Sequence, residues 1–177
     1  MRQFDSGGPR AQGPAVVWAG LDQGPALVVI DPAGEATHAE VPATWRPLAE
    51  RFQIAWCRVP ATGESLRDVE DVLETLAQDQ TRADLVVSGL VSDGALALAA
   101  LFDATVRSVL LVNPGPVEPG DQVRAAGVRS RIVAHSEGGD QDREEPPIPL
   151  GHPDVVAGVI TALADADRQP WPDVRDD

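Results

Sequence analysis

One apolar stretch near the middle of the chain constrains its fold more than any other feature. It begins after Asp84 and comprises an apolar run, a polar corner, an almost wholly apolar helical segment and a second apolar run (residues 85–91, 92–94, 95–102 and 109–112). This order predicts a βαβ unit. Strands that are apolar at every position, rather than at alternate ones, are typical of parallel sheets covered by helices on both faces. We therefore expect the centre of a parallel sheet here.

Parallel sheets of this kind bind ligands beyond the carboxyl ends of their strands. In this chain those ends are the corner from Val91 to Gly94 and the loop that follows Asn113. Any functional site is expected at these two places.

The whole chain predicts one domain between two irregular ends. Its 177 residues, 43 % of them hydrophobic, suffice for a buried core without disulfides or metal. Residues 1–14 predict a flexible arm, 15–166 a single α/β domain and 167–177 an acidic tail. The expected fold class is α/β, with a mostly parallel sheet of about six strands and helices on both faces.

Local patterns predict further elements of this domain. Residues 15–19 and 26–30 predict two strands, and the turn residues between them favour a hairpin. Thr44 and Ser65 are expected to cap helices, and a final helix is expected over residues 154–164.

Charge excludes several classes of partner. The formal net charge is -14, and all 14 basic residues are Arg. Phosphate backbones and anionic lipids would be repelled, so we expect neither nucleic acid nor a membrane as partner. The first residues lack the apolar core of a signal peptide and no apolar run reaches about 20 residues, which predicts a cytoplasmic protein.

No cofactor or metal is expected from the sequence. The acidic segment between Ser136 and Leu150 lacks the regular Asp/Glu spacing of calcium loops. The spacing of Gly89 and Gly94 is that of a phosphate loop, but no Lys follows. The single Cys57 is interpreted as a small buried hydrophobe.

The order of these pieces resembles the α/β-hydrolase family over roughly residues 15–165. The resemblance is carried by five short segments, which look like the family's first helix, the Gly-x-Ser turn, the nucleophile elbow, the strand of the catalytic acid and the catalytic His loop: Trp45-Arg46-Pro47-Leu48-Ala49-Glu50-Arg51-Phe52, Thr62-Gly63-Glu64-Ser65, Ser92-Asp93-Gly94-Ala95, Ile132-Val133-Ala134-His135-Ser136-Glu137 and Gly151-His152. No insertion long enough for a lid separates Asn113 from Arg131, so the resemblance implies a capless member with an open cleft.

The resemblance implies a catalytic triad of Ser92, Asp140 and His152. Ser92 would be the nucleophile and His152 its general base, while Asp140 would fix the tautomer of the imidazole. Asp142 and Glu137 compete with Asp140 for the acid position.

The resemblance also implies an oxyanion hole built from backbone amides of Asp93 and of the loop near Ala33. An elbow requires small residues two places on either side of the nucleophile. Ser92 has Gly94 after it but Leu90 before it, whereas keeping Gly89 in that place puts Val91 on the nucleophile position. Ser92 and Val91 both remain open as occupants of the apex.

Two functions follow as hypotheses. The first is a serine esterase or thioesterase that acts on a small acyl substrate through Ser92. The second is a non-hydrolytic protein of this fold, with a degenerate triad, that binds a small molecule or a protein partner, a second copy of the chain included. Fold alone does not choose between them.

Overall fold

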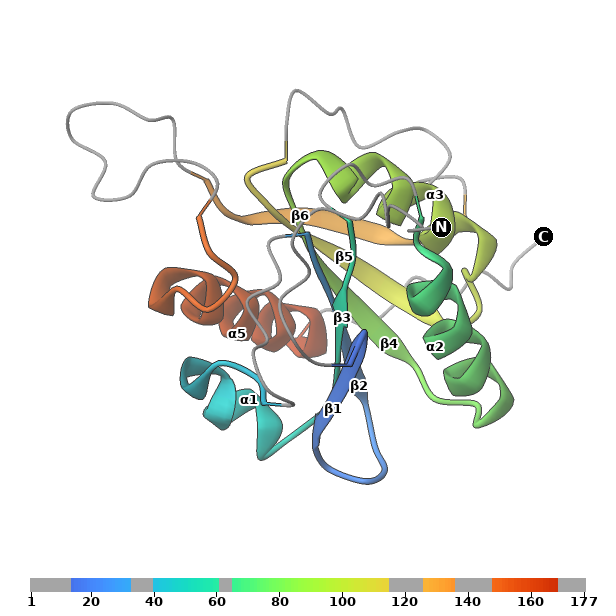
Figure 1. Ribbon diagram of the computed structural model, residues 1–177, viewed down its shortest axis with the longest axis horizontal. Coiled ribbons are helices and arrows are strands. Elements are labelled where there is room, and N and C mark those ends of the chain that lie inside the picture. Colours follow the sequence, from blue (N-terminus) through green and yellow to red (C-terminus); the bar gives the residue numbers. More distant parts are fainter. Residues whose placement is uncertain (1–13, 33–39, 61–64, 115–125, 136–147, 169–177) are drawn as a thin grey trace, which may run out of the picture.

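The computed structural model describes residues 14–32, 40–60, 65–114, 126–135 and 148–168, apart from the side chain of Leu90. Within these ranges the chain folds into one six-stranded sheet with helices on both of its faces (Figure 1). The strands are β1 (Val16–Gly20), β2 (Ala26–Asp31), β3 (Gln53–Arg58), β4 (Ala83–Ser88), β5 (Val106–Val112) and β6 (Arg129–Ala134). The helices are α1 (Arg46–Ala49), α2 (Arg67–Gln78), α3 (Ser92–Leu101) and α5 (Pro153–Arg168), with short 3-10 helices η1 (Ala43–Trp45) and η2 (Gly89–Val91).

The sheet is mostly parallel, which confirms the predicted α/β class. Its strand order is β1-β3-β2-β4-β5-β6, and only β1 runs antiparallel to its neighbour. The expected hairpin of β1 and β2 is wrong, because β1 pairs with β3 while β2 lies between β3 and β4. Every residue of β2 is buried, which requires a neighbour on each side, whereas the alternating burial of β1 suits an edge.

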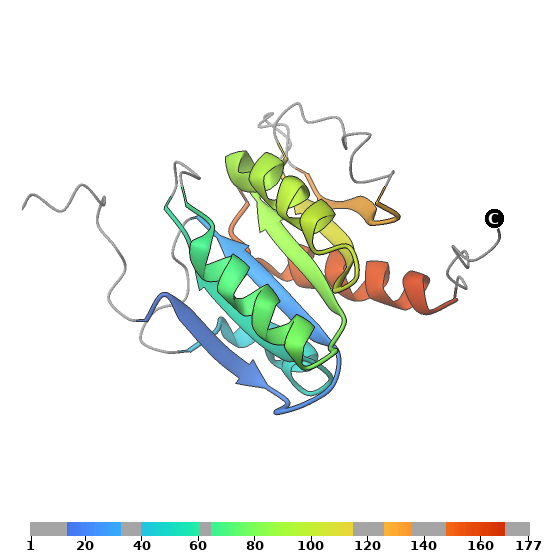
Figure 2. The same cartoon turned by 90° about the vertical axis from the view of Figure 1, so that its right-hand side faces the viewer.

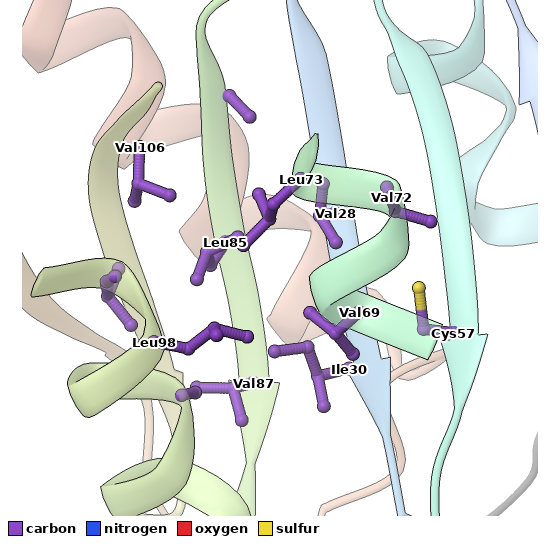
Figure 3. Close-up of a cluster of buried hydrophobic side chains, with 14 of the residues drawn as sticks. Val28, Ile30, Cys57, Val69, Val72, Leu73, Leu85, Val87, Leu98 and Val106 are labelled. Atoms are coloured by element: carbon purple, nitrogen blue, oxygen red, sulfur yellow. The ribbon is translucent and has the colours of Figure 1, made fainter. Parts of the chain in front are cut away.

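Two apolar layers cover the sheet. The side chains of α2 and α3 pack on one face, and those of α1 and α5 pack on the other (Figures 1 and 2). Figure 3 shows the first layer, in which Val69 and Leu73 of α2 lie over Ile30, Leu85 and Val28 of the sheet. The buried side chains are mainly Val, Leu and Ala, in agreement with the low aromatic content of 4 %. No helix in these ranges has both the length and the apolar character needed to cross a bilayer.

A partly buried ion pair lies at the amino end of the central strands. The carboxylate of Asp84, in β4, is 1 % exposed and accepts hydrogen bonds from Arg107 at 3.1 and 2.5 Å and from the Ser108 hydroxyl at 2.6 Å. The bonds to Asp84 raise the pKa of Arg107 and outweigh the opposing effect of its burial. Removing one partner of such a pair leaves a buried charge uncompensated, so the loss of either Asp84 or Arg107 would destabilise this end of the sheet, which lies away from the expected site.

A glycine allows α5 to lie close against β6. A Cβ atom built on Gly158 would stand 2.3 Å from the carbonyl oxygen of Val133. Gly158 is therefore a packing position, at which the helix backbone meets the strand backbone.

Gly158→Ala is expected to lower the free energy of unfolding by about 1–3 kcal/mol, because the added methyl group overpacks the helix–strand contact. Helix propensity alone predicts the opposite sign, a gain of about 1 kcal/mol. Urea unfolding measures the difference. The control is Ala157→Gly at the exposed neighbouring position, which should lose only the propensity of about 1 kcal/mol. A more stable Gly158→Ala variant would contradict the close approach.

Candidate functional site

The topology places the candidate site at the carboxyl ends of β2 and β4, which we call the switch point. β2 and β4 are parallel neighbours, but the chain leaves β2 toward β3 on one side and leaves β4 toward β5 on the other. Ligands of open α/β sheets bind where successive connections diverge in this way. Asp31 ends β2 there, and η2 leads from β4 into α3.

The turn after β4 differs from the sequence-based expectation. β4 ends at Ser88, three residues before Val91, where the apolar run ends (91 minus 88). Residues 89–91, which we call the β4–α3 corner, form η2, and Ser92 is already the first residue of α3. The expected Ser-Asp-Gly corner is therefore the first helical turn. Val91 is 2 % exposed and packs in the layer formed by α2 and α3, so its apolar character reflects helix packing rather than a strand.

Gly89 is the residue of the β4–α3 corner that has a left-handed backbone conformation. Its φ is +65°, in the left-handed region, whereas Val91 and Ser92 have φ of -81° and -58°. In the hydrolase elbow that the sequence resembles, the nucleophile itself occupies the strained position. Neither of the two expected occupants stands at the apex here. Gly89 stands there, and it carries no side chain.

The space beside Gly89 is open. A Cβ atom built on this residue would meet no heavy atom within 4 Å. A side chain at this position would therefore project away from the packed core at the switch point, where the glycine instead leaves the backbone accessible.

Ser92 lies inside the protein. It is 0 % exposed, and its hydroxyl donates a hydrogen bond of 2.6 Å to the carbonyl oxygen of Gly89. This bond braces the β4–α3 corner from within. The Ser92 hydroxyl therefore has a structural role in this corner. A catalytic role for Ser92 stays a prediction.

His152 stands at the start of α5. Its Nδ1 accepts a hydrogen bond of 3.1 Å from the backbone N–H of Asp154, as in an N-cap. A neutral imidazole that accepts at Nδ1 carries its proton on Nε2. The base of a Ser-His-Asp triad has the opposite tautomer, with Nδ1 donating to the acid. The proton of the Ser92 hydroxyl is donated to the carbonyl oxygen of Gly89, so it is not directed to His152 as a triad would require.

Two tryptophans connect residues 150–152, which we call the His152 loop, to the switch point. The indole N–H of Trp45 donates to the carbonyl oxygen of Leu150 at 2.8 Å, and Trp45 meets Trp56 edge to face with ring centroids 5.1 Å apart. The indole N–H of Trp56 donates to the Asp31 carboxylate at 2.9 Å, and Asp31 is fully buried. No local sequence pattern indicates this connection, because its members are far apart along the chain.

Neither expected helix cap forms as predicted. The hydroxyl of Thr44 donates to the carbonyl oxygen of Gly151 at 2.6 Å, so it holds the His152 loop instead. The N-cap of α2 is Leu66, and the Ser65 hydroxyl accepts only a long bond of 3.5 Å from the N–H of Arg67. The contact with Gly151 explains why Thr44 caps no helix, and the start of α2 at Arg67 explains why Ser65 does not.

Several expected site residues lie outside the described residues, namely Asp140, its competitors Asp142 and Glu137, and Ala33. Asp93 is described and is exposed in the first turn of α3. Across the described ranges, no three His, Cys, Asp or Glu side chains are grouped so that they could hold a metal ion.

A thiol introduced at Gly89 should react far faster than the natural thiol. Burial, with a smaller effect of the Asp68 charge, raises the pKa of Cys57 from 9.0 to about 12, so this thiol is inert at neutral pH. Gly89→Cys should be labelled by a maleimide in the folded protein, whereas wild type should be labelled only after unfolding.

The matched control for this labelling is Gly127→Cys. Gly127 also has a positive φ, of +73°, and open space beside it. If Gly127→Cys were labelled and Gly89→Cys were not, the space at the switch point would be closed, contrary to the structure.

Comparison with known proteins identifies no family. No family model matches the chain, and no curated protein matches it. A solved structure, "Crystal structure of Cfl2 wild-type from Burkholderia cenocepacia", is 25 % identical with a TM-score of 0.38 and covers 62 % of this chain. The match spans 44 % of Cfl2, less than half of its length. At this TM-score the likeness identifies neither a shared fold nor a shared function.

Proposed function

We propose that this chain is a non-hydrolytic protein of the α/β-hydrolase type that binds a small molecule at the switch point. The observation that carries the proposal is the β4–α3 corner. Gly89 occupies its apex and offers no nucleophile, and the nearest hydroxyl, that of Ser92, is buried and bonded to the Gly89 carbonyl oxygen.

Acyl transfer would require a different arrangement. A serine nucleophile needs a hydroxyl that a substrate carbonyl can reach and a base within about 2.6–3.2 Å to accept its proton. The Ser92 hydroxyl is 0 % exposed, and the Nδ1 atom of His152 accepts a bond from the backbone of α5. Both groups are thus used in holding the fold, which favours binding over hydrolysis.

The chemistry around the switch point favours an uncharged or cationic ligand. The net charge of -14 repels anions, and Asp93, exposed in the first turn of α3, adds a negative charge next to the β4–α3 corner. A glycine at the apex lets a ligand approach the backbone closely, where main-chain groups supply hydrogen bonds. A small polar molecule without phosphate groups fits these conditions.

A fluorophosphonate probe separates this proposal from the esterase hypothesis. We expect no labelling of wild type, with an active serine hydrolase in the same reaction as positive control. Ser92→Ala should change nothing in labelling and should lower the free energy of unfolding by about 1 kcal/mol, because one buried hydrogen bond is lost. Labelling of wild type that disappears in Ser92→Ala would overturn the proposal in favour of hydrolysis.

Ligand binding is tested with two matched variants. A panel of neutral, cationic and anionic small molecules is screened by thermal shift, and affinities of hits are compared in Gly89→Leu and Gly127→Leu. Both substitutions place a side chain on a left-handed glycine with open space beside it, but only the first fills the switch point. We expect Gly89→Leu to weaken binding by about tenfold or more and Gly127→Leu to leave it unchanged. Equal affinities in the two variants would place the ligand elsewhere.

A further inference from the structure

We propose that two copies of this chain pair through their β1 strands to form one continuous sheet. β1 is an edge strand, hydrogen-bonded on one side to β3 (Figure 2). This surface of β1 lies at the edge of the sheet beyond β3, apart from the proposed ligand site at the ends of β2 and β4.

The outer side of β1 presents unpaired backbone groups. The bonds Arg58 N–H to Ala15 C=O and Leu21 N–H to Phe52 C=O fix which residues of β1 face β3. Because these bonds alternate along an antiparallel pair, the N–H and C=O groups of Val16, Trp18 and Gly20 point outward. Within the described part of the chain, no backbone partner for these outward groups is seen. Such an edge is a template for another strand.

The two edges of the sheet differ in protection. Natural edge strands are commonly guarded by charged side chains or proline. β6 carries Arg129 and Arg131, whereas β1, with the sequence Val-Val-Trp-Ala-Gly, carries neither a charge nor a proline, although 24 % of the chain is charged. A large apolar side chain, Trp18, is 49 % exposed on this unguarded edge.

A second copy is the occupant that this edge fits. A two-fold axis through the middle of β1 pairs the strand with itself in antiparallel orientation, which closes the assembly at two copies. Centred on Trp18, this pairing sets each outward N–H of one copy against an outward C=O of the other. The two Trp18 side chains then lie directly opposite each other on one face, as an aromatic cross-strand pair. β1 contributes no charge to the contact, so the strand itself adds nothing to the repulsion between two copies of net charge -14.

Sedimentation velocity of the full chain tests the proposal. The mass should be twice the chain mass of 18.7 kDa, and the dimer fraction should rise with salt, which screens the repulsion between two acidic copies. Trp18→Lys should halve the mass by placing a charge on the edge. The matched control is Ile132→Lys, which alters a side chain of similar exposure, 52 %, on the opposite edge and should leave the dimer intact.

A second variant, Val16→Pro, tests the proposal independently in case Trp18→Lys does not fold. Val16→Pro removes an outward N–H without touching the bonds to β3, a substitution that edge strands tolerate. It should also yield the monomer, with a circular dichroism spectrum like that of wild type. A wild type that is monomeric at all salt concentrations, or a Trp18→Lys variant that stays dimeric, would overturn the proposal. Slow hydrogen exchange at Val16, Trp18 and Gly20 in a monomeric wild type would likewise overturn it, because another part of the same chain would then cover the edge.

Discussion

Burial of β2 and β4 on both faces is the constraint on which the rest of the structure depends. Every residue of these two strands is inaccessible to solvent or nearly so. The Val, Leu and Ile side chains among them each contribute roughly 1.5–3 kcal/mol by leaving water, provided that helices cover both faces. The chain must therefore turn within a few residues after β4 and lay α3 back over the sheet. The left-handed glycine at position 89 makes this short turn, and its position directly after the strand determines which groups the switch point presents.

Aromatic and polar contacts hold the layer formed by α1 and α5 against the carboxyl ends of the central strands. α1 has only four residues and cannot be stable alone. Trp45, immediately before it, anchors it by packing edge to face on Trp56, a contact typically worth about 0.5–1.5 kcal/mol beyond burial. Through their indole N–H groups the two rings also satisfy the Leu150 carbonyl and the Asp31 carboxylate. The loop that the hydrolase resemblance would assign to a catalytic histidine is thus held by a structural network, which is consistent with the binding function proposed for the switch point.

The sequence predicts the layer architecture but not the position of the β4–α3 corner. Continuous apolar strands can be recognised without a structure, because burial on both faces removes the alternation seen at a surface. The apolar run extends past the end of β4 because a strand and a buried 3-10 turn both select apolar residues such as Val91. One available signal was Gly89, a glycine interrupting the apolar run. The burial of Ser92 and the bond between Trp56 and Asp31 depend on packing between distant segments, and no local pattern encodes them.

The conformation of Gly89 is the central claim, and a single substitution tests it most directly. A Cβ atom on this residue meets nothing within 4 Å, so Gly89→Ala changes stability only through the backbone. The measurement is the free energy of unfolding of Gly89→Ala against wild type by urea titration. The left-handed φ of +65° predicts a loss of about 1–2 kcal/mol. A gain of about 0.4–1 kcal/mol, the usual effect of replacing a glycine that has an ordinary conformation, would contradict the account and move the apex of the corner to another residue.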